Sequence, residues 1–164
     1  MNILSELARK KKIQYFLQSL PLDARILEVG SGTGWVSMFL KKTGFANYSN
    51  IDLTPPADIV GDINNWQALG LKAGTYDYII AFEVVEHVDC FQSCHDLLKE
   101  GGQLLLTTPL PHMDWVMRIL EFLKLNQKRT SPHDCLVYLN RVSQFEHRQV
   151  RIIGFLSQWG IFTK

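Results

Sequence analysis

The chain has 164 residues, of which 46% are hydrophobic and 20% are charged, and its formal net charge is +1. This length supports one domain that buries most of its apolar surface. A net charge so close to zero provides no overall field that would attract nucleic acid or an anionic membrane, so we do not expect nucleic acid as a partner. No apolar run approaches the roughly 20 residues that a helix needs to cross a bilayer, so we expect no membrane span.

The three cysteines, Cys90, Cys94 and Cys135, are odd in number and include no Cys-x-x-Cys pair. This usage is typical of reduced thiols and argues against structural zinc. The basic residues near the N-terminus are not followed by the apolar core of a signal peptide. The sequence therefore predicts a cytoplasmic protein.

The first predicted helix extends from about residue 5 to residue 20, where apolar residues recur at intervals of three and four before Pro21. We expect it to cover either the edge of a sheet or a bound cofactor. Its basic run, from Arg9 to Lys12, is expected on a solvated face, although it would also suit an acidic partner or a membrane surface.

A short apolar strand is then predicted to lead directly into a cofactor-binding turn. The alternating glycines Gly30, Gly32 and Gly34 permit positive φ and let the main chain lie against a ligand before a helix begins. A dinucleotide fingerprint requires Gly-x-Gly-x-x-Gly, but here the third glycine comes one residue early and Trp35 fills its position. The absence of Gly-Lys-Ser/Thr excludes a nucleoside triphosphate loop on pattern. The carboxylate of Glu28, just before the glycines, favours a ligand with a positive charge.

A helix over residues 36–42 and a strand over residues 48–52 complete a βαβ unit. Asp52 lies 22 residues after Gly30, at the tip of the strand beside the glycine loop. In a doubly wound sheet, a carboxylate at that tip can accept hydrogen bonds from both ribose hydroxyls of a nucleoside. The alternative is an aspartate that only caps the turn before the two prolines that follow.

Two further strand ends carry acids. Residues 59–63 form a short apolar run that contains Asp62, and a helix is expected around residues 66–69. Residues 76–82 are a continuous apolar run, which is typical of a buried strand, and Glu83 ends it.

Strands and helices continue to alternate in the rest of the chain. The predicted elements are a helix over 84–98, a turn at Gly101 and Gly102, a buried strand over 103–108, a helix over 113–125, a polar loop over 126–132, and strands over 150–155 and 159–162. The pattern predicts the α/β class, with a doubly wound, mainly parallel Rossmann-like sheet, helices on both faces and a short C-terminal β hairpin. We predict a single domain over residues 1–164, in which 1–21 form the N-terminal helix, 22–109 the cofactor-binding core and 110–164 the acceptor-side loops and terminal strands.

These residues together resemble the class I S-adenosylmethionine-dependent methyltransferases, in particular the group that includes ubiquinone-biosynthesis and small-molecule methyltransferases. The resemblance covers about residues 26–109, half of the chain. It is carried by Glu28-Val-Gly-Ser-Gly-Thr-Gly34, Asp52, Gly61-Asp62-Ile63, Tyr76-Asp77, Glu83-Val-Val-Glu86-His87 and Leu98-Lys-Glu-Gly-Gly102. It implies the class I methyltransferase fold, methyl transfer as the activity and S-adenosyl-L-methionine as the cofactor.

The resemblance also implies which residues hold the methionine part of the cofactor. The loop of Gly30, Ser31, Gly32 and Gly34 would pass beneath it, with Glu28 near its ammonium group. Glu83 would lie at the same end of the cofactor and face the methyl acceptor.

The nucleoside part of the cofactor would be held by the ends of the next two strands. The resemblance implies that Asp52 holds the ribose hydroxyls and that Leu53 packs on the adenine. Asp62 would accept a hydrogen bond from the exocyclic amine, and the amide of Ile63 would donate one to a ring nitrogen.

Because a sulfonium is already a good leaving group, such an enzyme mainly aligns an in-line attack and deprotonates a hydroxyl acceptor. His87 is the candidate catalytic base by position, and a helix-capping or core histidine is the alternative. Glu83, Glu86 and His87 have i, i+3 and i+4 spacing, so a helix that begins at Glu83 would let them hold Mg²⁺ or Mn²⁺. Relatives without metal carry a similar string, so we predict no metal site.

His112 and His133 are expected on the acceptor side, because one follows the carboxyl end of a strand and the other lies in a long polar loop. A surface turn without function is the alternative for His133. No Asn-Pro-Pro-Tyr-type motif follows Phe82, which disfavours methylation of DNA adenine. The prediction is methyl transfer to an oxygen or nitrogen of a small molecule, such as a saccharide- or quinone-like compound, by a monomer or homodimer. Two alternatives stay open: a non-catalytic S-adenosylmethionine-binding module or subunit, and a metal-assisted RNA 2′-O-methyltransferase.

Overall fold

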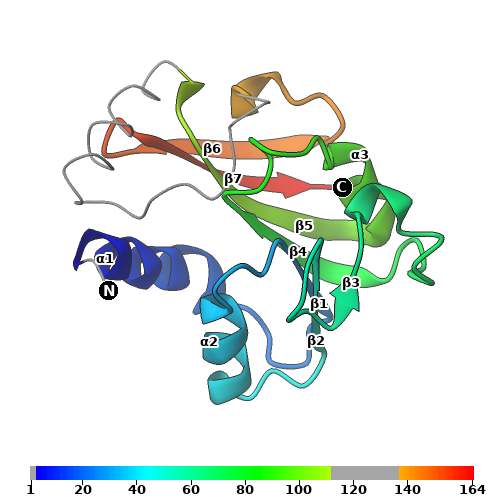
Figure 1. Ribbon diagram of the computed structural model, residues 1–164. Coiled ribbons are helices and arrows are strands. Elements are labelled where there is room, and N and C mark those ends of the chain that lie inside the picture. The colour runs from blue at the N-terminus through cyan, green and yellow to red at the C-terminus, as the bar shows by residue number, and fades with distance from the viewer. Residues whose placement is uncertain (1–2, 112–136) are drawn as a thin grey trace.

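The computed structural model describes residues 3–111 and 137–164, which build one twisted sheet with helices packed on it (Figure 1). The strands are β1 Ile26–Val29, β2 Tyr48–Asp52, β3 Ile59–Val60, β4 Tyr76–Phe82, β5 Leu98–Pro109, β6 His147–Ile153 and β7 Ser157–Thr163. They lie in the order β3-β2-β1-β4-β5-β7-β6. Neighbours from β3 to β5 are parallel, whereas β7 is antiparallel to both β5 and β6. The predicted doubly wound, mainly parallel sheet with a C-terminal hairpin is confirmed.

Helices cover both faces of the sheet, as predicted. On one face, α1 (Ile3–Lys12) continues into a π-helical turn over Ile13–Leu17, and α2 (Trp35–Thr43) packs beside it. The apolar side chains of this layer are Phe16, Leu17, Val36 and Leu40, which meet Ile26, Ile80, Leu105 and Trp159 of the strands. On the other face, α3 (Phe91–Leu97) contributes Phe91, Cys94 and Leu97, which pack with Leu27, Ile79, Leu104 and Phe162. The continuous apolar runs of β1, β4 and β5 are thus explained, because each strand is buried on both sides.

The helix predicted over residues 84–98 is wrong in its first half, because α3 begins only at Phe91. Glu83 has a φ of 59°, which turns the chain sharply out of β4. Val84 and Val85 then enter the core, and the Asp89 carboxylate accepts a hydrogen bond (3.3 Å) from the Phe91 amide at the start of the helix. Core packing of this segment and the Asp89 hydrogen bond therefore place the start of the helix nearly two turns later than predicted.

Smaller differences have local causes. The turn predicted at Gly101 lies inside β5, where Leu98 pairs with Tyr76 before a register shift and Gln103 resumes the ladder opposite Tyr78. The helix expected around residues 66–69 is instead a short 3₁₀ turn over Ile63–Asn65 followed by further turns. The hairpin strands are longer than expected and meet at a turn through Gly154, whose φ is 58°.

The helix predicted over 113–125 and the loop over 126–132 lie outside the described residues. Of the helices in 3–111 and 137–164, none combines the length and apolar character needed to cross a membrane.

Candidate functional site

The strand order brings four of the predicted site segments to one edge of the sheet. Because β3, β2, β1 and β4 are parallel neighbours, their carboxyl ends lie in a row. Asp62 follows β3, Asp52 ends β2, the glycine loop follows β1 and Glu83 follows β4. In open α/β sheets, ligands bind at this edge, where the order of the strands reverses on either side of the first strand.

The three glycines of the loop have different tasks, although all have positive φ (73°, 46° and 69°). A Cβ at Gly30 would lie 2.6 Å from Cγ2 of Val84, so this glycine allows the loop to pack against the segment after β4. A Cβ at Gly32 or Gly34 would meet nothing within 4 Å. Gly34 is also the N-cap residue of α2. The open space that a ligand requires is therefore at Gly32 and Gly34, whereas Gly30 serves the fold.

Glu28 is buried beneath this loop. Its side chain is on the face of β1 that packs under α2, and it accepts a hydrogen bond from the Tyr48 hydroxyl. Burial raises the pKa of Glu28 to about 7, and the nearby carboxylates of Asp52 and Asp58 add to the rise, while the Tyr48 bond opposes it. Glu28 thus exchanges a proton in the neutral range directly below the predicted methionine end of the site.

Asp52 joins the tip of β2 to the glycine loop. Its Oδ2 accepts a hydrogen bond from the Gly32 amide at 3.1 Å, and its Oδ1 accepts one from the Thr54 amide at 3.3 Å. The next side chain, Leu53, is 71% exposed, which is unusual for a residue of its size beside a buried strand. A carboxylate beside an exposed apolar side chain fits a ribose that continues into a flat base.

Asp62 and Ile63 follow β3. One oxygen of Asp62 accepts a hydrogen bond from the Asn64 amide at 2.9 Å and caps the 3₁₀ turn, while the Ile63 side chain is buried. Asn64 is held in turn by the Asp89 carbonyl, to which its side-chain amide donates (3.0 Å). Asp62 is therefore fixed at the edge by a local turn.

Glu83 is held from two sides. Its Oε1 accepts a hydrogen bond from the Thr107 hydroxyl at 2.7 Å and forms an ion pair with the Lys12 ammonium at 2.8 Å. The Glu83 side chain is 42% exposed, and the partial desolvation of its carboxyl, which raises the pKa, is outweighed by the Lys12 charge and these hydrogen bonds, which lower it overall. Glu83 is thus an anion at the end of β4. Lys12 does not lie on a solvated face, so the expectation for the basic run is wrong at this residue.

Glu86 and His87 lie in the turn after Glu83. Glu86 is buried and accepts a hydrogen bond from the Thr108 hydroxyl at 3.0 Å. Burial and the neighbouring charge of Glu83 raise the pKa of Glu86 to about 8. The His87 side chain is exposed, and its backbone amide donates to the Val84 carbonyl (2.8 Å).

No helix begins at Glu83, so the i, i+3, i+4 arrangement of Glu83, Glu86 and His87 does not form. Across residues 3–111 and 137–164, no group of three His, Cys, Asp or Glu side chains is placed to hold a metal ion.

Several residues at this site were not predicted from the sequence. The Arg9 guanidinium donates to the Thr33 hydroxyl at 3.3 Å and lies 5.8 Å from the centre of the Trp35 ring. Trp35 stacks on Phe82 at a centroid distance of 5.8 Å. The N-terminal helix thus lies over the glycine loop. The only signals in the sequence were the bulky Trp35 next to the last glycine and the helical spacing of the cations.

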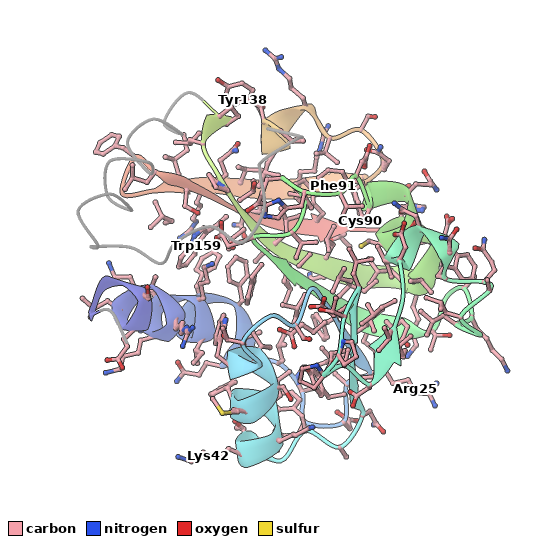
Figure 2. All side chains as sticks on the ribbon, in the orientation of Figure 1. Arg25, Lys42, Cys90, Phe91, Tyr138 and Trp159 are labelled. Atoms are coloured by element: carbon pink, nitrogen blue, oxygen red, sulfur yellow. The ribbon has the colours of Figure 1, made fainter. Side chains whose placement is uncertain are left out.

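Trp159 of β7 closes this layer on the hairpin side. It lies between the sheet and the N-terminal helical segment (Figure 2), with its ring centre 5.4 Å from that of Tyr15 and 5.3 Å from that of Phe16. The candidate acceptor residues His112 and His133 lie outside the described residues.

Gln158 of β7 forms hydrogen bonds with the backbone on both sides of residues 112–136. Its amide nitrogen donates to the Pro109 carbonyl (3.2 Å) and the Val137 carbonyl (2.9 Å), and its oxygen accepts from the Leu139 amide (3.0 Å). Gln158 therefore joins the end of β5 to the segment around Leu139.

Comparison with known proteins identifies the family. A family model described as a methyltransferase domain matches residues 4–150, which is most of the chain. The chain belongs to this methyltransferase family. Its members are class I methyltransferases that use S-adenosylmethionine, so the methyltransferase fold, the enzyme class and the cofactor implied by the sequence are confirmed. No curated protein matches the sequence significantly.

Solved structures share the methyltransferase fold at low sequence identity. A SAM-dependent methyltransferase from Archaeoglobus fulgidus superposes with a TM-score of 0.68 at 13% identity, over 97% of this chain and 94% of that one. The PH0226 protein from Pyrococcus horikoshii gives 0.65 at 15% identity, over 96% and 90%. The CMeT domain of the citrinin polyketide synthase gives 0.66 at 19% identity, over 96% and 52%. The chain therefore spans about half the length of some of the proteins it matches, as it also does for a putative sarcosine dimethylglycine methyltransferase from Galdieria sulphuraria (52%).

Proposed function

We propose that this methyltransferase transfers a methyl group from S-adenosylmethionine to an oxygen or nitrogen of a small-molecule acceptor, such as a saccharide- or quinone-like compound. The observation that carries the assignment of the cofactor site is the row formed by Asp62, Asp52, the open glycine loop and Glu83 at the carboxyl edge of the sheet. The edge offers oxygen acceptors for a ribose and an adenine amine, and carboxylates for the cationic end of the cofactor.

The proposed binding roles follow the strand order. Asp52 accepts hydrogen bonds from the ribose hydroxyls, and the exposed Leu53 packs on the adenine, whose edge is bonded by Asp62 and the Ile63 amide. Each oxygen of the Asp52 carboxylate accepts one backbone hydrogen bond, which leaves a second lone pair on each for a ribose hydroxyl.

The methionine end is held by the other two strand ends. Gly30, Ser31, Gly32 and Gly34 carry the main chain beneath it, Glu28 lies under the loop and Glu83 attracts its positive charges.

S-adenosylmethionine, when bound, supplies an electrophilic methyl group on a positively charged sulfur. The chain's own task is to orient the acceptor in line with that methyl group and to exclude water. A lone pair on the acceptor forms the new bond to the methyl carbon, and the electrons of the broken bond return to sulfur. For a hydroxyl acceptor, we assign the proton to the ring of His87, which is exposed on the turn after β4. His112 and His133 remain the proposed acceptor-side residues.

Asp52→Ala tests the cofactor site. Loss of the ribose hydrogen bonds is expected to weaken S-adenosylmethionine binding by about 1–3 kcal/mol, or roughly 5- to 150-fold in Kd. Isothermal titration measures the affinity, and Asp23→Ala is the matched control, because Asp23 is an exposed carboxylate at the opposite edge of the sheet. Equal affinities of the two variants would remove Asp52 from the site.

A non-catalytic binding module or subunit is the second candidate, because the chain spans about half of some proteins it matches. Incubation with S-adenosylmethionine and cell extract, followed by mass spectrometry of S-adenosylhomocysteine, separates the two. Production of S-adenosylhomocysteine above that of a Gly32→Val control supports the enzyme, and tight binding without turnover supports the module.

The free, buried thiols of Cys90 and Cys94 suit the proposed cytoplasmic location.

A further inference from the structure

One lysine of the basic run is built into the site. The side chain of Lys12 is only 11% exposed, and its ammonium lies 5.3 Å from the centre of the Phe82 ring as well as 2.8 Å from Glu83. Lys10 and Lys11, its neighbours in the sequence, are exposed. Removing an ammonium from water is costly unless an anion faces it, so the position of Lys12 depends on an ionised Glu83.

Two carboxyl groups lie close to this one cation. Glu83 is within 2.8 Å of Lys12, whereas Glu86 is bonded to Thr108 and is more deeply buried. The Glu83 side chain is 42% exposed, whereas Glu86 is buried, and two neighbouring carboxyls repel each other when both are ionised, so the buried one holds its proton more tightly. A hydrogen bond donated by a protonated Glu86 would further lower the pKa of Glu83. The lysine therefore determines which carboxyl carries the negative charge.

We propose that Lys12 is a positioning residue for methyl transfer, which fixes the negative charge on Glu83 at the methyl-donor end of the site and leaves Glu86 as its neutral partner. This rests on the proposed function, because it takes Glu83 to face the cationic end of S-adenosylmethionine. Lys12 itself touches neither cofactor nor acceptor and acts through Glu83.

Among the groups around Glu83, Lys12 has the largest effect in keeping its carboxylate ionised. Among residues 3–111 and 137–164, the titratable groups that act on Glu83 are Lys12 from α1 and Glu86 from the turn after β4, and β5 adds the Thr107 hydroxyl. Arg9, also on α1, is directed to Thr33 and Trp35. Without Lys12, the strongest influence that lowers the pKa of Glu83 is lost, and this pKa rises. The site would then lose negative charge at a higher pH than in the wild-type chain, and the affinity for a cationic ligand would fall with it.

The test is the pH dependence of S-adenosylmethionine affinity, measured by isothermal titration from pH 5.5 to pH 8. The variants are Lys12→Met, Lys12→Arg, and Lys10→Met as the matched control on the exposed face of the same helix. We expect the affinity of Lys12→Met to fall with decreasing pH by up to about tenfold per pH unit more than that of Lys10→Met. Lys12→Arg, which keeps the cation, should follow the control. Titration of the ligand and of Glu28 is common to all variants and cancels in the comparison.

The outcomes separate the inference from the proposed function. No binding by the wild-type chain overturns the proposed function. Binding by the wild-type chain, with parallel pH profiles for Lys12→Met and Lys10→Met, overturns the role of Lys12 alone. If Lys12→Met does not fold, Lys12→Met/Glu83→Gln is compared with Glu83→Gln, since the neutral amide removes the unpaired charge. Equal affinities are expected there, because Lys12 acts only through Glu83, and a difference between these two variants also overturns the proposal.

Discussion

Substitution of two glycines of the same loop should separate folding from binding. Both Gly30 and Gly32 have positive φ, so an alanine at either position costs about 1–2 kcal/mol of left-handed strain. At Gly30 the new methyl would also lie 2.6 Å from Cγ2 of the buried, β-branched Val84, and overpacking of this kind adds about 1–3 kcal/mol. At Gly32 it would meet nothing within 4 Å. We therefore expect Gly30→Ala to lose about 2–5 kcal/mol of unfolding free energy and Gly32→Ala only about 1–2 kcal/mol.

Urea unfolding followed by tryptophan fluorescence measures the free energy of unfolding. Isothermal titration with S-adenosylmethionine measures the affinity for the cofactor. Gly32→Ala should fold and bind at least tenfold more weakly, by roughly 1.4 kcal/mol, because the methyl occupies the space proposed for the cofactor. Gly32→Val should not bind detectably. Equal destabilisation of the two alanine variants would refute the packing role of Gly30, and wild-type affinity in Gly32→Val would refute the placement of the cofactor.

Two further predictions concern buried polar groups. Because burial raises the pKa of Glu28 to about 7 from 4.5, the folded chain binds this proton more tightly than the unfolded chain, and stability is lost as the pH rises through that interval. Glu28→Gln stays neutral and can still accept a hydrogen bond from Tyr48. In urea titrations between pH 4.5 and pH 8, it should remove up to about 3 kcal/mol of the loss in unfolding free energy. The same pH dependence in the variant and the wild-type chain would contradict this prediction. Gln158→Leu leaves three backbone groups without their partner and should cost about 2–4 kcal/mol of unfolding free energy, whereas Gln149→Leu on the exposed face of β6 should cost less than about 0.5 kcal/mol. Similar urea midpoints for these two variants would contradict the stabilising role of the Gln158 hydrogen bonds.

The features predicted correctly from the sequence are those that local chemistry determines. Continuous apolar runs mark strands buried on both faces, as in β4, and alternating glycines mark a loop of positive φ, as observed from Gly30 to Gly34. The presence of Asp52 and Glu83 at the same edge of the sheet, on either side of the glycine loop, followed once the strands were taken as parallel.

Tertiary packing decided the features that were predicted incorrectly. The sequence pattern of residues 84–90 fits a helix. In the structure, however, Val84 packs against Gly30, and the Asp89 carboxylate accepts a hydrogen bond from the Phe91 amide, where α3 begins. For the same reason, the sequence could not show that Gly30 serves packing while Gly32 leaves open space, because the partner of Gly30 lies more than fifty residues away.

The pairing of Lys12 with Glu83 spans 71 residues, and no local rule predicts such a pair. A periodic signal was nevertheless present. Arg9, Lys12 and Phe16 have i, i+3 and i+7 spacing, so both cations share the helix face of a buried aromatic, whereas Lys10 and Lys11 are rotated away from it. Long basic side chains can cover apolar surface with their stems while the charge reaches a partner, so basic residues at core-facing positions of a helix need not be solvated. When such a helix precedes a glycine loop and an acid at a strand end, its inward-facing cations are candidates for the binding site.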